Sequence, residues 1–178
     1  MPGPSFETDE ITASDAAGGF SSGKVPLDEF FAGQAWSNHA RGLGKTFVLR
    51  RPAGETSLPA LVGFYTLCMS SIPRERLARA PRKTRTNVPR EVPVALVGRL
   101  AVDARAQHRR FGERLLVDAF RRVLASADNV GCAGVLVDAK DDGAVAFYAR
   151  YGFIDLDPAA AFPRAMLIAI DTVRSAAK

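Results

Sequence analysis

The fold is decided by 94-VALVGRLAVDARAQHRRFGERLL-116, in which an apolar run gives way to a charged turn and then to an amphipathic pattern. The run 92–103 is apolar at nearly every position, which predicts a strand in the centre of a sheet. From 112 to 127 the apolar side chains recur at helical spacing, so a helix is expected there. The stretch therefore predicts a strand, a turn and the start of a helix.

A junction of this kind is a ready anion site. The first turn of a helix has unpaired N–H groups and a partial positive charge. The residues that a phosphate would approach are Gln107, His108, Arg109, Arg110 and Gly112. The pattern favours a phosphate-binding turn, and the alternative is a helix cap that arose by chance.

The other segments complete a mixed sheet. A helix is expected to begin at Pro26 and to end at Gly42 and Gly44. Its apolar face consists of Leu27, Phe30, Phe31, Ala35 and Trp36. Strands are predicted near 6–11 and at 45–51, 58–72, 134–139 and 164–170, and a short helix at 143–151. This order predicts an α/β fold with helices on both faces of the sheet. Residues 1–24 are expected to be mostly irregular, and the whole chain, 1–178, to form a single domain.

The composition suits a globular protein in the cytoplasm. Of 178 residues, 47% are hydrophobic and 24% are charged. No apolar run approaches the roughly 20 residues that span a bilayer, and MPGPSFETDE lacks the apolar region of a secretory signal. Cys68 and Cys132 are expected to be buried free thiols, with a disulfide as the alternative. The sequence has only two histidines, so no histidine-based metal site is expected.

Positive charge is concentrated in a basic insert, residues 74–91, between two apolar segments. The formal net charge of the chain is +5. From Arg74 to Arg90 the insert holds one acid, Glu75, and the basic residues Arg74, Arg76, Arg79, Arg82, Lys83, Arg85 and Arg90. It is expected to form a short helix and a loop, either as a solvated surface or as a platform for phosphates. No aromatic residue is interleaved, so base stacking by this segment is not indicated.

Two motifs resemble the signatures of the GNAT acetyltransferases. The pattern Gln107-x-x-Arg110-x-Gly112 resembles the pyrophosphate-binding signature, with Arg110 in place of its first glycine, and 144–153 resembles the second signature. The segments 20–31, 41–49 and 137–153, together with the basic insert, resemble the acetyltransferase toxins of bacterial toxin–antitoxin pairs. This resemblance implies the GNAT fold, a mixed and mostly antiparallel sheet with helices on both faces.

The resemblance also implies a reaction. Such toxins transfer acetyl from acetyl-CoA to the α-amine of aminoacyl-tRNA and so stop translation, and their partner is a ribbon-helix-helix antitoxin. A homodimer is a further expectation. The residues implied to hold acetyl-CoA are Leu100, Ala101, Val102, Gln107, His108, Arg109, Arg110, Phe111, Gly112, Glu113 and Phe147. Tyr148 corresponds to the tyrosine that protonates the CoA sulfur, and Arg82, Lys83 and Arg85 are expected to contact tRNA.

Several alternatives stay open at this point. The enzyme could instead acetylate a small-molecule or protein amine without an antitoxin, or the chain could bind CoA or a partner without catalysis. Tyr148 could serve packing only, which is the role expected of Tyr151 on the same short helix. Because glycine tolerates unusual backbone angles, Arg110 must either keep an ordinary conformation or carry strain, and its side chain could meet a phosphate. An ordinary phenol, of pKa about 10, suits a thiolate leaving group.

Overall fold

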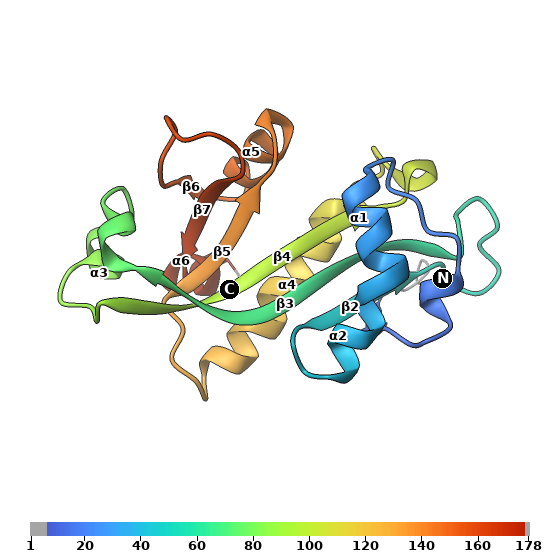
Figure 1. Cartoon of the computed structure of the whole chain (residues 1–178), viewed down its shortest axis with the longest axis horizontal. Coiled ribbons are helices and arrows are strands. Elements are labelled where there is room, and N and C mark those ends of the chain that lie inside the picture. Colours follow the sequence, from blue (N-terminus) through green and yellow to red (C-terminus); the bar gives the residue numbers. More distant parts are fainter. Residues whose placement is uncertain (1–6, 177–178) are drawn as a thin grey trace. The chain divides into compact units, whose positions relative to one another are not determined.

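The structure is a computed structural model and describes residues 7–176. Its strands form a seven-stranded sheet in the order β1-β2-β3-β4-β5-β7-β6 (Figure 1). Strands β4 and β5 are parallel, whereas the β1–β2, β2–β3, β5–β7 and β6–β7 pairs are antiparallel. The strands are β1 Thr8–Glu10, β2 Lys45–Arg50, β3 Leu61–Pro73, β4 Glu91–Val102, β5 Gly134–Ala139, β6 Ile154–Asp155 and β7 Arg164–Ala169.

The helices lie in segments where the sequence predicts helical structure, with one addition. They are α1 Val25–Phe30, α2 Trp36–Ala40, α3 Arg82–Arg85, α4 Phe111–Ala127, α5 Asp142–Ala149 and α6 Ile170–Ala176. A π-helical segment, Phe31–Ala35, joins α1 to α2. The α6 helix and the two-residue strand β6 were not expected. None of the helices in residues 7–176 is long and apolar enough to cross a membrane. The same residues contain no group of three or more potential metal ligands.

The chain forms two compact units, one of residues 1–68 and 99–119 and the other of residues 69–98 and 120–178. In the first unit α1 and α2 cover one face of β2 and β3, and the beginning of α4 covers the other (Figure 1). On the α1 side, the ring centroids of Phe31 and Phe64 lie 4.6 Å apart in the core. On the α4 side, a Cβ atom at Gly63 would lie 2.8 Å from Leu115 Cδ1 and 2.7 Å from the Ala101 carbonyl oxygen. Glycine at 63 therefore lets α4 pack closely on β3.

The predicted apolar face of the first helix is wrong at Trp36. Phe30, Phe31 and Ala35 are buried, but Trp36 is 38% exposed and His39 is buried in its place. A π-helical turn contains one more residue than an α-helical turn, so residues after Ala35 are rotated around the axis. The Trp36 ring lies over the His39 ring instead, with the ring centroids 6.0 Å apart.

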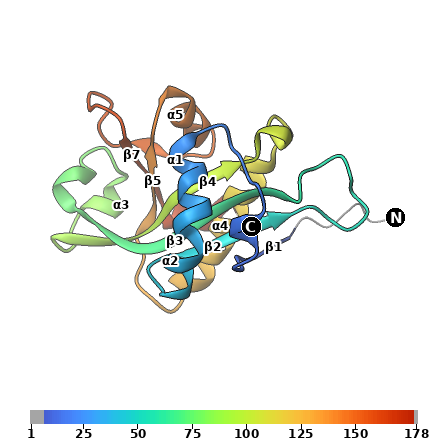
Figure 2. The ribbon, with the colours of Figure 1, turned by 45° about the vertical axis from the view of Figure 1, so that its right-hand side comes forward.

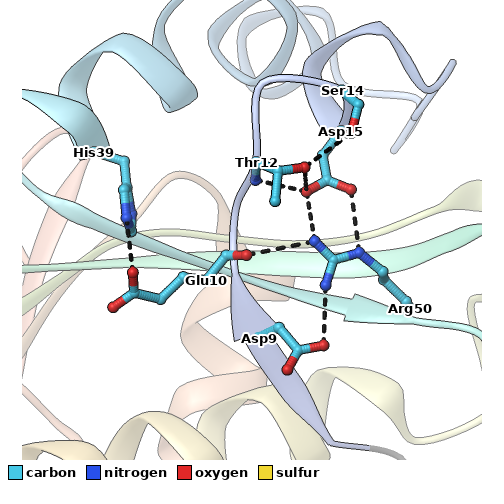
Figure 3. A network of polar contacts seen from close by, with 7 residues as sticks. All are labelled: Asp9, Glu10, Thr12, Ser14, Asp15, His39 and Arg50. Atoms are coloured by element: carbon cyan, nitrogen blue, oxygen red, sulfur yellow. Dashed lines mark hydrogen bonds and ion pairs between the residues drawn. The ribbon is translucent and has the colours of Figure 1, made fainter.

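A polar network ties the N-terminal strand to its neighbours (Figure 3). The Arg50 guanidinium donates to Asp15 at 2.6 and 3.2 Å and to Asp9 at 2.9 Å. His39 Nε2 lies 3.2 Å from Glu10 Oε2, while its Nδ1 accepts from the Thr46 N–H. The network thus connects β1, β2 and α2. Of the strand predicted near 6–11, Phe6 lies outside the described residues.

The second unit contains the basic insert between β3 and β4. A hydrogen bond of 2.9 Å from Arg74 N–H to the Arg90 carbonyl closes the insert at its base. Leu77 and Ala80 are buried in a core that includes Leu136 and Leu167. The predicted short helix and loop are in fact a 3-10 turn, Arg74–Leu77, and the four-residue helix α3.

The two cysteines are less buried than the sequence predicts. Cys68 and Cys132 are free thiols, as expected. Both are half-buried rather than buried, so the predicted burial is wrong.

Candidate functional site

The turn after β4 is organised by Asp103. This side chain is fully buried and accepts hydrogen bonds from the backbone N–H of Arg105 (3.0 Å) and from its guanidinium (2.8 Å for each of two). The Ser21 N–H also donates to it, at 3.3 Å. Burial acts to raise the pKa of Asp103, but the hydrogen bonds from Arg105 and Ser21 outweigh it and hold the pKa below its usual value. An ionised carboxylate therefore fixes the start of the turn.

Gln107 is exposed, but its side-chain amide anchors the turn. Its Nε2 donates to the Ser22 carbonyl at 2.9 Å and to the Val102 carbonyl at 3.1 Å. Ser22 is held in turn by Asp28, which accepts from the Ser22 hydroxyl at 2.6 Å and from its N–H at 2.7 Å. The first residue of the motif thus positions the turn through backbone carbonyls. Sequence reasoning missed Asp103, Ser22 and Asp28, because the contacts that join Ser21 to Asp103 and Ser22 to Gln107 connect distant parts of the chain.

Of the two backbone conformations considered for Arg110, ordinary or strained, the structure has the strained one. His108 and Arg110 both have φ of 62°, in the left-handed region that glycine favours. Each such residue costs about 1–2 kcal/mol relative to a right-handed conformation. The Arg110 side chain is 82% exposed, and its Nε lies 2.8 Å from Glu113 Oε2. Arg110 thus has the left-handed backbone conformation that the glycine of the usual motif favours.

The backbone of this turn has a feature that favours an anion. His108 and Arg110 are left-handed at alternate positions, and successive N–H groups that alternate between right- and left-handed conformations form anion-binding concavities in proteins. The turn continues into the 17-residue helix α4, where Phe111 is buried and Gly112 and Glu113 lie in the first turn. Arg109 is exposed, with its Cζ 5.8 Å from the centre of the Phe111 ring. Oriented N–H groups, the helix terminus and nearby cations all favour an anion here.

The end of β4 offers a second set of N–H groups. Asp103 N–H donates to the Val62 carbonyl of β3 at 2.9 Å. Since N–H directions alternate along a strand, Ala101 N–H also points toward β3, whereas Leu100 and Val102 N–H point away from it. In the described residues the pairing of β4 with β5 covers only Ala95–Val97, so it does not extend to Leu100 and Val102. The N–H groups of these two residues thus point away from β3 at a place beyond the β5 pairing.

Tyr148 lies in the last turn of α5, in the second unit. Its side chain is 8% exposed, and its ring packs 5.1 Å from Phe147 and 5.3 Å from Phe153, measured between centroids. Burial, and then the charge of Asp138, raise the pKa of Tyr148 to about 12. An ordinary phenol pKa is thus the wrong expectation, because this hydroxyl group is shielded from water. Phe147 is half-buried and also contacts Tyr151, at 5.1 Å between centroids.

Tyr151 does not share the helix with Tyr148. Helix α5 ends at Ala149, and the Tyr151 N–H donates to the Tyr148 carbonyl at 3.0 Å in the turn that follows. Gly152, with φ of 90°, completes that turn. The predicted helix therefore extends two residues too far, and Tyr151 lies half-buried beside Arg150.

The basic insert presents its cations to solvent. In α3 the Thr84 side chain is buried, and Arg82, Lys83 and Arg85 are exposed. Arg85 Nε donates to the Ala80 carbonyl at 3.1 Å, which orients one of the three side chains. The other four basic residues of the insert are also exposed: Arg74, Arg76, Arg79 and Arg90.

The predicted residues thus form three groups. Leu100, Ala101, Val102 and the run from Gln107 to Glu113 surround one turn in the first unit. Phe147 and Tyr148 form an aromatic cluster in the second unit, and Arg82, Lys83 and Arg85 lie on the insert of that unit.

Comparison with known proteins identifies the family. No family model matches the sequence. The chain is 39% identical over 143 residues to the tRNA-acetylating toxin of Mycobacterium tuberculosis, across 80% of this chain and 81% of that protein. The structure of a tyrosine-to-phenylalanine mutant of KacT matches with a TM-score of 0.83 and 26% identity, over 96% of this chain and 98% of that chain.

Two further structures share the fold. AtaT complexed with acetyl-methionyl-tRNAfMet has a TM-score of 0.82 at 24% identity, over 98% of this chain and 100% of that one. A tyrosine-to-phenylalanine mutant of AtaT bound to the C-terminus of the antitoxin AtaR and acetyl-CoA has a TM-score of 0.77 at 22% identity, over 97% and 98%. The expected GNAT fold is confirmed. The chain belongs to the tRNA-acetylating toxins, the GNAT-type acetyltransferases of type II toxin–antitoxin systems.

The backbone at Arg110 gives a first prediction. Arg110→Gly removes about 1–2 kcal/mol of strain, offset by about 0.5–1 kcal/mol of added chain entropy, so the unfolding free energy should rise by no more than about 1.5 kcal/mol. Acetyl-CoA affinity, measured by calorimetry, should be kept or increased. Arg110→Val places a β-branched residue at positive φ and should weaken binding about tenfold or more. Arg110→Ala is the control for losing the Glu113 ion pair. Wild-type affinity in the valine variant would contradict this role of the backbone.

The burial of Tyr148 gives a second prediction. At pH 10.5 an ordinary phenol is about three-quarters ionised, whereas one of pKa about 12 is about 3% ionised. The phenolate absorbance of the wild-type protein at this pH should therefore nearly equal that of Tyr148→Phe. Circular dichroism at the same pH checks that both proteins stay folded. A difference close to one full phenolate would show that Tyr148 is not shielded.

Proposed function

We propose that this chain transfers the acetyl group of acetyl-CoA to the α-amine of aminoacyl-tRNA, blocks translation and is neutralised by a cognate antitoxin. The observation that carries the proposal is the 39% identity, across 80% of the chain, to a tRNA-acetylating toxin. The phosphate-binding turn and the buried tyrosine supply the chemistry that this reaction requires.

Acetyl-CoA is the proposed co-substrate, and its pyrophosphate is assigned to the turn Gln107–Glu113. In this assignment the backbone N–H groups between His108 and Glu113 contact the phosphates, and Gln107 positions the turn. Exposed Arg109 adds positive charge. The half-buried Phe147 is assigned to contact another part of acetyl-CoA. When bound, acetyl-CoA supplies an acetyl group activated as a thioester.

The reaction breaks the bond between carbonyl carbon and sulfur and forms one between that carbon and the amine nitrogen. The amine loses a proton and the sulfur gains one. Backbone N–H groups of Leu100 and Val102 are assigned to the thioester carbonyl oxygen, where negative charge develops. The ester of an aminoacyl-tRNA lowers the pKa of its own α-amine, so a strong enzymic base is not required.

Tyr148 is the proposed hydrogen-bond donor to the leaving sulfur. Its raised pKa keeps the phenol protonated at neutral pH, so the donor is always present. The same rise in pKa makes complete transfer of the proton less favourable than it is for an ordinary phenol. Tyr148 therefore stabilises charge on the sulfur through its hydrogen bond more than by acting as a strong acid.

Arg82, Lys83 and Arg85 are proposed to contact the phosphates of tRNA. Their side chains are exposed on a short helix whose Thr84 is buried, so they face solvent together. A type II antitoxin of the ribbon-helix-helix class and a homodimer are further parts of the proposal, both implied by the resemblance to toxin–antitoxin acetyltransferases.

Single-turnover acetylation of a mixed pool of charged tRNA tests the function and Tyr148 together. The wild-type protein should acetylate charged tRNA but not deacylated tRNA. Tyr148→Phe should lower the rate by on the order of 10² to 10⁴ and keep acetyl-CoA affinity, since only the hydroxyl is removed. Tyr151→Phe is the matched control and should keep the wild-type rate. Acetylation of small amines with none of charged tRNA would favour the alternative acetyltransferase.

Charge reversal tests the tRNA surface. Changing Arg82, Lys83 and Arg85 to glutamate should raise the KM for aminoacyl-tRNA. The dependence of log kcat/KM on log salt should become less steep by about 0.7–0.9 for each phosphate that the variant no longer neutralises. The KM for acetyl-CoA should not change. The same reversal at exposed Arg41, Lys45 and Arg121 controls for net charge. Equal effects of the two triple variants would assign the insert to a general solvated surface.

A further inference from the structure

The loop between β6 and β7 exposes an uncharged apolar run. Residues 158–163, PAAAFP, are all exposed, and the Phe162 side chain is 42% exposed. We call these six residues the apolar loop. Contiguous apolar surface of this kind marks sites of interaction more often than single exposed residues do.

The apolar loop is held in place by Arg164. This side chain is only 13% exposed and lies 3.2 Å from Asp155 and 3.0 Å from Asp142. It also donates to the Pro158 carbonyl, at 3.0 Å. At the other end, Leu156 is buried in the core of the second unit. Both ends of the loop are thus fixed, although its middle faces solvent.

The Phe162 ring is stacked on the same guanidinium. Arg164 Cζ lies 4.4 Å from the ring centroid, a distance typical of a cation–π contact. An aromatic ring held by an arginine has a defined orientation and loses little freedom when a second flat group stacks on it. Nucleobases stack on such rings in proteins that bind single-stranded ends.

The same arginine places the loop beside the helix of Tyr148. Its bond to Asp142 joins the loop to the first residue of α5, and Tyr148 lies in the last turn of this helix. Eight residues of helix extend about 12 Å. The loop rises next to α5 in both views of the molecule (Figures 1 and 2).

We propose that Phe162 is the stacking platform for the 3′-terminal base of aminoacyl-tRNA. This inference rests on the proposed function and adds the residue that recognises the end of the substrate. The terminal nucleotide carries the amino acid, so its base is the one nearest to the reacting amine. The basic insert has no aromatic residue. In this proposal the basic insert recognises phosphates through its charge, and the apolar loop recognises the terminal base by stacking.

The test is steady-state kinetics with Phe162→Ala, Phe162→Leu and Phe162→Tyr. Loss of base stacking should lower kcat/KM for aminoacyl-tRNA by about 5- to 150-fold in the alanine and leucine variants. The tyrosine variant should stay close to wild type, and the KM for acetyl-CoA should not change in any of them. Val130→Ala, which also shortens an exposed apolar side chain of the second unit, is the control and should have no effect.

A thermodynamic cycle identifies the partner of the ring. A chemically aminoacylated RNA whose terminal nucleotide lacks its base should be a poorer substrate for the wild-type enzyme by the same factor. With Phe162→Ala, removing the base should have almost no further effect, because the two changes delete the same stacking interaction.

The remaining outcomes overturn the proposal in distinguishable ways. If the wild-type enzyme acetylates no charged tRNA, the proposed function fails and the platform with it. If the wild-type enzyme is active and Phe162→Ala has the same kcat/KM, only the platform fails. Full activity of Phe162→Leu would also overturn stacking. Loss of antitoxin binding with unchanged tRNA kinetics would assign the loop to the antitoxin instead.

Discussion

The buried carboxylate of Asp103 is the interaction on which the geometry of the turn Gln107–Glu113 depends. It is fully buried and is satisfied by Arg105 and by the N–H of Ser21, which lies 82 positions earlier in the chain. Because the pKa of this carboxyl is lowered in the folded protein, its contribution to stability is present above about pH 4 and is lost as the pH falls through the lowered pKa. The Ser21–Ser22 segment, once held there, supplies the carbonyl that anchors Gln107. Two contacts, which we call the clamps, thus join the N-terminal segment to the turn: Ser21 N–H to Asp103, and Gln107 Nε2 to the Ser22 carbonyl.

These clamps explain how arginine can occupy a glycine position. His108 and Arg110 each have a left-handed backbone, which the isolated chain would leave at a gain of about 1–2 kcal/mol per residue. The residues before them are held by Asp103 and Gln107, and Phe111 behind them is buried in the first unit. The path of the chain between two fixed points therefore determines these angles. The Arg110 side chain itself is exposed and pairs with the Glu113 carboxylate, at 2.8 Å between Nε and Oε2.

The strongest sequence patterns predicted most of the fold. The apolar runs predicted β2 to β5 and β7, and the helical periodicity predicted α4. These patterns are long compared with the few residues by which a predicted boundary is usually displaced. Shorter features were missed. A two-residue strand such as β6 has no periodicity, and the π-helical turn that exposes Trp36 has no distinct sequence signal. At the candidate site the motif predicted a turn before α4, which the structure contains, and the role expected of Tyr148 stays a prediction. The roles of Asp103 and Ser22 depend on contacts between distant residues, and the pKa of Tyr148 depends on burial and on Asp138, so the local sequence indicates neither.

The shielded phenol places a constraint on how protons move in the proposed reaction. The net change takes one proton from the amine to the sulfur, so Tyr148 must end each turnover in the protonated state in which it began. A phenol of pKa about 12 gives up its proton reluctantly, but its phenolate would recover one readily from any group of lower pKa. The negative charge of Asp138 acts in the same direction, since it disfavours a second negative charge beside it. The arrangement therefore favours a reaction in which Tyr148 donates a hydrogen bond throughout and never stays ionised. The acid strength of the phenol is then less important than its fixed position, and the close packing of Phe147 and Phe153 around the ring supplies that position.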